Sequence, residues 1–252
     1  MTDFTLDSYF LIIDSALEAD YQLVTVNDLF DKRSVQKQHI VLRHDVDRRP
    51  QNALNIARGE SDRGVRSTYY FRIIPSTFKP DIIKAIHELG HEIGYHYEDF
   101  HVARYDPKKA FNLFQQHLGA LREIAPIKTI VMHGSPMARF NNMELWNYHK
   151  FESMNVKDCI LSYDWSNYGF FTDTGRSFSA CKTNLRDTIG GIAFPEIATS
   201  KQLADFFINR RHPRIQFSTH PERWNYFGFD WMRQLITDKT LNAVKLGLSI
   251  IR

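Results

Sequence analysis

Segments with the hydrophobic pattern of a strand alternate along this chain with segments that have the pattern of a helix. Apolar or β-branched runs that predict strands lie at residues 21–26, 39–47, 67–74, 91–98 and 127–134. Amphipathic patterns that predict helices lie before or between them, at residues 4–20, 51–64, 79–90 and 106–125. Because strand and helix alternate, we expect a parallel sheet with helices packed against it.

The alternation is less regular in the second half of the chain. Helical patterns lie at 141–149 and 200–210, strand-like patterns at 158–166, 190–197 and 214–224, and a helix follows to the C-terminus. This number of strands predicts an α/β protein whose sheet closes into a (β/α) barrel. No linker or repeat divides the chain, so we expect one domain over residues 1–252, with residues 1–38 as a helix-and-strand extension packed on it.

Composition and charge narrow the classes of protein that fit this pattern. With 252 residues, of which 43% are hydrophobic, the chain is long enough to bury one large core. Its 32 basic and 29 acidic residues form no lysine or arginine run, so we do not expect a nucleic-acid partner. Arginines alternate with aromatic residues at 63–72, and a strand with solvated ends explains that stretch.

The sequence predicts neither a membrane span nor a disulfide framework. No apolar run approaches the roughly 20 residues that cross a bilayer, and the first residues lack the basic region of a signal peptide. Cys159 and Cys181 lie far apart and match no CxxC or finger-like spacing, which argues against a disulfide framework or a structural zinc site. We therefore expect a cytoplasmic protein.

Histidines and acids gather where the predicted strands end. The stretches RHDVD, GYHYEDFH, MHGSP, SYDW and STHPERW occupy residues 43–47, 94–101, 132–136, 162–165 and 218–224. A single histidine at a strand end is usually a solvated or core residue. In a barrel, however, the carboxyl ends of all the strands surround one mouth, so these side chains are expected to converge on a single site.

The two acids of RHDVD are expected to share one face of their strand. Alternate side chains of a strand point the same way, so Asp45 and Asp47 face one side while Val46 packs on the other. Two carboxylates so close together suit a divalent metal bound by one of them, with the other free to act as a base. The alternative is a pair of N-cap residues at the turn before Pro50.

Histidines from other strand ends complete this predicted site. Imidazole together with carboxylate suits zinc or another first-row metal, and His96 is the leading imidazole ligand. His133 is favoured as the third ligand, and His101 competes with it, although His96 and His101 meet only across a turn. His220, which precedes Pro221, is a candidate to donate a proton to a leaving group, the alternative being a structural histidine bonded to an acid.

Taken together, these motifs resemble those of the polysaccharide deacetylase superfamily, which includes carbohydrate esterase family four, and in particular its divergent members with an HDVD opening. The resemblance covers residues 40–224. RHDVD resembles the first family motif, which implies that Asp45 is the catalytic base and Asp47 a metal ligand. HEIGYHYED resembles the second motif and implies a metal-binding His96, and STHPERW resembles the last and implies that His220 is the general acid.

The resemblance also implies a fold and an activity. The fold would be a distorted, seven-stranded (β/α) barrel of polysaccharide deacetylase type. The activity would be that of a metal-dependent hydrolase, with zinc as the expected metal, that removes the acetyl group from an N-acetylated sugar in a glycan or glycan precursor. Two alternatives stay open: hydrolysis of another C–N bond in a small cyclic amide, and a catalytically weak glycan-binding relative.

Two family features are altered in this sequence. The second motif of the family has another ligand histidine four residues after the first, and that position here is Phe100, with His101 one place later. The third family motif, whose arginine steadies the base, is replaced by MHGSP, so His133 either coordinates the metal or takes that orienting place. The stretch TDTGRSF could bring Arg176 to the substrate, the alternative being a surface turn.

Overall fold

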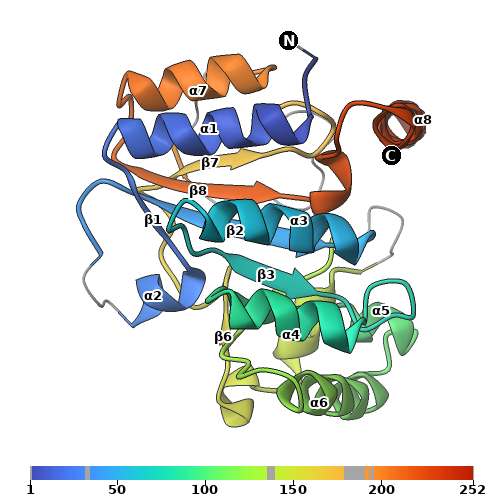
Figure 1. Cartoon of the computed structure of the whole chain (residues 1–252). Helices are drawn as coiled ribbons and strands as arrows, with labels where there is room; N and C mark the ends of the chain where they lie inside the picture. Colours follow the sequence, from blue (N-terminus) through green and yellow to red (C-terminus); the bar gives the residue numbers. More distant parts are fainter. Residues whose placement is uncertain are drawn as a thin grey trace.

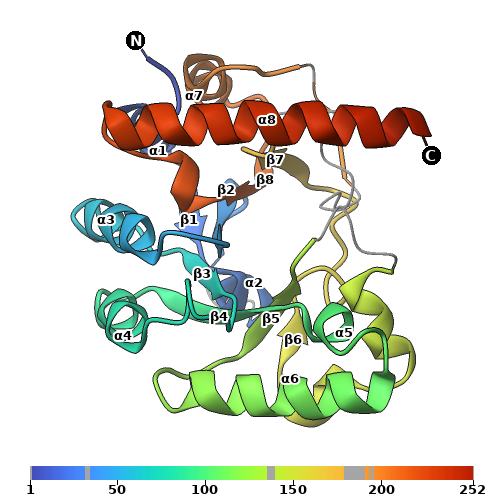
Figure 2. The same ribbon diagram turned by 90° about the vertical axis from the view of Figure 1, so that its right-hand side faces the viewer.

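The computed structural model of the protein describes residues 2–31, 35–134, 140–178, 191–192, 194 and 196–251, with side chains as far as residue 243. Its strands are β1 (Gln22–Val24), β2 (His39–Val46), β3 (Thr68–Phe71), β4 (Glu92–Tyr97), β5 (Thr129–Met132), β6 (Lys157–Asp158), β7 (Gly169–Thr172) and β8 (Arg214–Thr219). They pair in parallel in the order β6-β5-β4-β3-β2-β8-β7, and β1 pairs with the first half of β2. This path curls into a half-barrel (Figure 2), which confirms the predicted α/β fold with a distorted, seven-stranded barrel.

The helices are α1 (Leu6–Glu18), α2 (Val26–Phe30), α3 (Pro50–Ser61), α4 (Pro80–Glu88), α5 (Asp99–Val102), α6 (Pro107–Arg122), α7 (Ser200–Ile208) and α8 (Phe229–Ile251), with the 3-10 helices η1 (Asn142–Asn147), η2 (Phe151–Met154) and η3 (Pro221–Arg223). Figure 1 shows α1 and α7 side by side, and α3, α4 and α6 following one another along the outside of the sheet. No helix within the described residues is both long enough and apolar enough to cross a membrane.

Local signals in the sequence account for the helix ends. Thr5 caps α1 and forms a capping box with Ser8, and Asp106 caps α6 by accepting a backbone N–H. Gly64 and Gly90 follow α3 and α4 with φ angles of 69° and 93°, a left-handed conformation that glycine adopts without steric cost. The helix ends predicted at these two glycines are therefore confirmed.

Strand β2 is buried on both faces, and its two faces have different surroundings. Ile40, Leu42 and Val46 pack in the core between the sheet and the outer helices. Val41 faces the inside of the curl, in a second apolar cluster that includes Tyr70 of β3. Because side chains alternate along a strand, the odd-numbered residues of β2 point to the inside of the curl. The polar motifs lie at the carboxyl end of this strand and of its neighbours.

The strand predicted at 158–166 is wrong beyond its first residue. β6 ends at Asp158, whose Oδ1 accepts the backbone N–H groups of Ile160 (2.8 Å) and Leu161 (3.1 Å). An aspartate that bonds the backbone just after it favours a turn over a continued strand, despite the apolar residues that follow.

Strand β7 (Gly169–Thr172) was not among the predicted strands. The predicted strand at 190–197 lies partly outside the described residues, and within it Ile192 forms an isolated parallel bridge with Gly169 of β7. β7 itself pairs with β8 over four residues. A strand this short shows too little periodicity to be separated from loop sequence.

A buried polar network ties α1 and α3 to the outer face of the sheet. The carboxylate of Glu60, in α3, accepts hydrogen bonds from the hydroxyl groups of Tyr9 and Tyr69 and lies 2.9 Å from Nε2 of His44. His44, which belongs to the RHDVD stretch, therefore points away from the inside of the barrel. Burial alone would raise the pKa of Glu60, but His44 and its other partners lower it to about 2.

Glu60→Gln is expected to lower the free energy of unfolding at pH 7 by about 3 kcal/mol, because it removes one charge from a fully buried pair. The stabilisation by wild-type Glu60 is present above pH 4.5 and is lost as the pH falls toward 2, so the difference between the two proteins should shrink over that range. Urea unfolding of both proteins at several pH values measures this difference in unfolding free energy. Glu88→Gln, at an exposed position of α4, is the matched control and should change stability by less than about 0.5 kcal/mol.

Candidate metal centre

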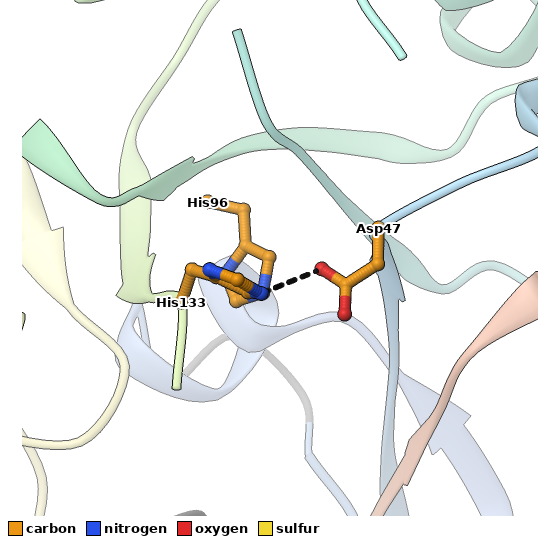
Figure 3. Close-up of side chains that lie close together, drawn as sticks. All are labelled: Asp47, His96 and His133. Atoms are coloured by element: carbon orange, nitrogen blue, oxygen red, sulfur yellow. Dashed lines mark ion pairs between the residues drawn. The ribbon is translucent and has the colours of Figure 1, made fainter. Parts of the chain in front are cut away.

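Three potential metal ligands lie together where the strands end. Asp47 directly follows β2, His96 lies in β4, and His133 directly follows β5. Oδ1 of Asp47 is 3.4 Å from Nε2 of His96 and 3.5 Å from Nε2 of His133. One ligand atom from each residue lies within 4.8 Å of the other two, and Figure 3 shows the side chains pointing toward one another. We call these three residues the candidate metal centre.

The surroundings of the two imidazoles suit metal binding. Nδ1 of His96 is 3.2 Å from the carbonyl oxygen of Val131, and Nδ1 of His133 is 3.1 Å from Oε2 of Glu98. Because both oxygens only accept, each neutral imidazole carries its proton on Nδ1 and presents the lone pair of Nε2 to Asp47. Oδ1 of Asp47 is buried and has no hydrogen-bond partner among the described residues. Two imidazole nitrogens around an unsatisfied carboxylate oxygen fit a zinc ion.

The pKa values of Asp47 and His133 shift in opposite directions, because each group favours the charged form of the other. Burial alone would raise the pKa of Asp47, but the imidazoles of His133 and His96 hold it well below its usual range. Burial also disfavours a charged His133, yet Asp47 and Glu98 together raise its pKa to about 10. The positive charge can be a proton on His133 or a metal ion that displaces this proton.

Two residues lie in α5, outside the candidate metal centre: His101, which competed with His133 in the sequence, and Phe100, which stands where the resembled family has its second ligand histidine. Phe100 is 3% exposed and packs in the helix-side core, where its ring contacts Tyr105. His101 is exposed, and its Nδ1 lies 3.0 Å from the hydroxyl of Tyr105. The position that holds a ligand in the resembled family is therefore a core position here, and His133 is the histidine that the fold brings to Asp47.

Asp45 lies on the inward face of β2, two residues before Asp47, which follows the end of that strand. Its Oδ2 accepts hydrogen bonds from Arg43 (3.1 Å) and from the hydroxyl of Ser218 (3.4 Å), and its buried Oδ1 has no partner among the described residues. The alternative that these acids cap α3 is wrong, because the N-cap residue is Arg49 and no side-chain hydrogen bond caps that helix within the described chain. Arg43 thus holds Asp45 in one orientation.

His220 is held by an acid that sequence analysis did not predict. Nδ1 of His220 is 2.6 Å from Oδ1 of Asp173, and the backbone N–H of His220 donates to Oδ2 of the same carboxylate. Arg223 and the indole N–H of Trp224 also donate to Asp173, at 3.0 and 2.9 Å. The carboxylate is therefore fixed by four donors and keeps the proton of the imidazole on Nδ1 when His220 is neutral.

The register of β2 and β8 places His220 at the same end of the sheet as the first acid of RHDVD. His44 pairs with Thr219 in the ladder, so His220, one residue beyond β8, follows the last residue of β8 that pairs with β2, and Asp45 is the residue that follows His44. Burial lowers the pKa of His220 and so does Arg223, but Asp173 and Asp47 together raise it to about 9. His220 is consequently protonated at neutral pH, as a general acid must be.

Arg176 lies away from the three potential ligands. Its guanidinium pairs with Asp238 of α8 at 3.0 Å and lies over the rings of Phe4 and Trp231. The stretch does form a turn, in which the backbone N–H of Arg176 donates to the carbonyl of Asp173 (3.0 Å), but the side chain of Arg176 is only 10% exposed. The predicted role of Arg176 in substrate binding stays a prediction.

Four polar residues near the site were missed. Asp173 follows β7, a strand that was not predicted, and Glu98 follows His96 by two residues, a spacing that places both on one face of a strand. Arg72 was taken for a solvated strand end, but it is 17% exposed and pairs with Glu98. Glu222 is buried, its Oε2 has no partner within the described chain, and burial together with Asp47 raises its pKa to about 7.

Fold and site together define an α/β protein with a potential metal-binding centre at the carboxyl ends of its parallel strands. No protein family model and no curated protein matches the chain. Solved structures do match, among them a mutant of BA3943, a CE4 family pseudoenzyme with restored enzymatic activity. It is 12% identical, with a TM-score of 0.41, over 83% of this chain and 64% of that one. The chain thus spans less than two thirds of the length of that protein.

Proposed function

We propose that this protein is a metal-dependent hydrolase that removes the acetyl group from an N-acetylated sugar of a glycan or glycan precursor. The observation that carries the proposal is the candidate metal centre, together with Asp45, which Arg43 orients two residues before Asp47, and His220, whose pKa Asp47 helps to raise. The choice of an N-acetylated sugar rests on the motifs that resemble those of polysaccharide deacetylases. A cytoplasmic location is part of the same proposal.

Each residue of the site has a separate task in this reaction. Asp47, His96 and His133 would hold zinc, which acts as a Lewis acid on the amide carbonyl when it is bound. Asp45, fixed by Arg43, takes the proton of the attacking water through its unpartnered Oδ1.

The leaving amine receives its proton from His220. The Nε2 of His220 donates this proton while Asp173 keeps the ring in place through Nδ1. The C–N bond breaks, and the products are acetate and a free amino sugar.

The purified protein is expected to bind about one equivalent of zinc and to release acetate from at least one member of a panel of N-acetylated mono- and oligosaccharides. A chelator should stop this release and added zinc should restore it, which metal analysis and an acetate assay would show. Wild-type protein without stoichiometric metal, in metal-replete buffer, would favour the glycan-binding alternative instead. Zinc binding with hydrolysis of cyclic amides alone would favour the other hydrolase.

A further inference from the structure

We propose that Glu98, held in place by Arg72, is a positioning residue that sets the affinity of the candidate metal centre for zinc through His133. The inference deepens the proposed function and rests on it. Arg72, Glu98 and His133 form one continuous chain of contacts on the side of His133 that faces away from Asp47.

The contacts of this chain are short and largely shielded from water. Two nitrogens of Arg72 lie 2.7 to 3.0 Å from the carboxylate oxygens of Glu98, in a forked arrangement that fixes the carboxylate plane. Oε2 of Glu98 then accepts the Nδ1 proton of His133 at 3.1 Å. The side chains of Arg72, Glu98 and His133 are 17%, 12% and 15% exposed.

The location of His133 explains why it needs such support. His96 lies within β4, where the ladder to β5 fixes its backbone and a backbone carbonyl accepts its ring proton. His133 lies one residue beyond β5, held by one further backbone hydrogen bond to Tyr97 (2.7 Å) and by Asn142, whose side chain donates to its carbonyl. The ring direction of His133 therefore depends on Glu98 more than that of His96 depends on any side chain.

Charge balance indicates that Glu98 supports a metal ligand and does not itself bind the metal. The candidate metal centre consists of Asp47, His96 and His133, while Glu98 lies on the opposite ring nitrogen of His133. Arg72 offsets the negative charge of Glu98. Glu98 can thus raise the basicity of the His133 ring without adding net negative charge to the site.

The test is zinc affinity measured by competition with a chromogenic chelator, for the wild type, Glu98→Gln, Arg72→Gln and the double variant. Glu98→Gln is expected to weaken zinc binding by about 10- to 100-fold, because a neutral amide is a poorer acceptor for the imidazole proton. Arg72→Gln should weaken it less. If Arg72 acts through Glu98, adding Arg72→Gln to Glu98→Gln should cause little further loss.

Two further measurements separate positioning from general damage. Glu92→Gln removes a partly buried acid from the other end of β4 and should leave zinc affinity unchanged, even if it lowers thermal stability. The visible spectrum of the cobalt-loaded Glu98→Gln protein should match that of the wild type at saturation, because the ligands stay the same.

Wild-type zinc affinity in Glu98→Gln would overturn the proposed role of Glu98 and leave the proposed function standing. A changed cobalt spectrum at saturation would make Glu98 a ligand and also overturn the positioning role. A wild-type protein that binds no zinc would overturn both proposals at once.

Discussion

Replacement of His133 by alanine is expected to weaken zinc binding by on the order of 100- to 1,000-fold, because each ligand supplies a few kcal/mol of the affinity of a zinc site. The reason is structural: His133 is one of only three ligand side chains in the candidate metal centre, and its loss leaves Asp47 and His96. Acetate release should fall with metal occupancy at a fixed, low zinc concentration. Chelator competition and metal analysis measure the affinity.

His101→Ala is the matched control for this prediction. It removes a histidine that competes with His133 in the sequence, but its ring contacts Tyr105 and is exposed. Zinc affinity in this variant should therefore equal that of the wild type. Full affinity in His133→Ala together with a loss in His101→Ala would show that the third ligand is His101.

His220→Ala is expected to lower kcat by about 10²- to 10⁴-fold while zinc affinity stays unchanged, because His220 supplies the proton of the leaving amine. Its pKa of about 9 sets the pH dependence: the ring is protonated below this value, so activity should fall as the pH rises through about 9. In Asp173→Asn the carboxylate that raises this pKa is gone, and the alkaline limb should move to lower pH.

Full pH–rate profiles with saturating zinc test this assignment. His212→Ala replaces a histidine at the opposite end of β8, where Nδ1 lies near the carbonyl of Arg214, and should leave the profile unchanged. An unchanged alkaline limb in Asp173→Asn would contradict the role of His220 as general acid. So would a normal kcat in His220→Ala.

The prediction of the candidate site from the sequence relied on strand periodicity. The alternation along β2 places Asp45 and Val46 on opposite faces, as the local geometry of any strand requires, and Asp47 lies one residue beyond the strand, where its backbone N–H donates to the carbonyl of Asp45. The same rule, applied to His96 and Glu98, would have identified Glu98. Glu98 was missed because the neighbouring sequence does not distinguish an acid that binds a metal from an acid that accepts a hydrogen bond from a metal-binding histidine.

Strand periodicity could not identify the site residues that lie in short or irregular segments. Asp173 follows the four-residue β7, and its partner His220 is 47 positions away, so only the pairing of β7 with β8 joins them. Arg72 looks like a solvated strand end in the sequence, as Arg66 is, but the fold turns it onto Glu98.

The sequence by itself determined the alternation of strands and helices, the inward face of β2 and the presence of acids and imidazoles at the strand ends, because each depends on residues close together in the chain. Only the tertiary structure places His133 beside Asp47, His101 beside Tyr105 and Phe100 in the core. These outcomes depend on how β2, β4 and β5 lie in one curled sheet, which brings side chains from distant strands within reach of one ion.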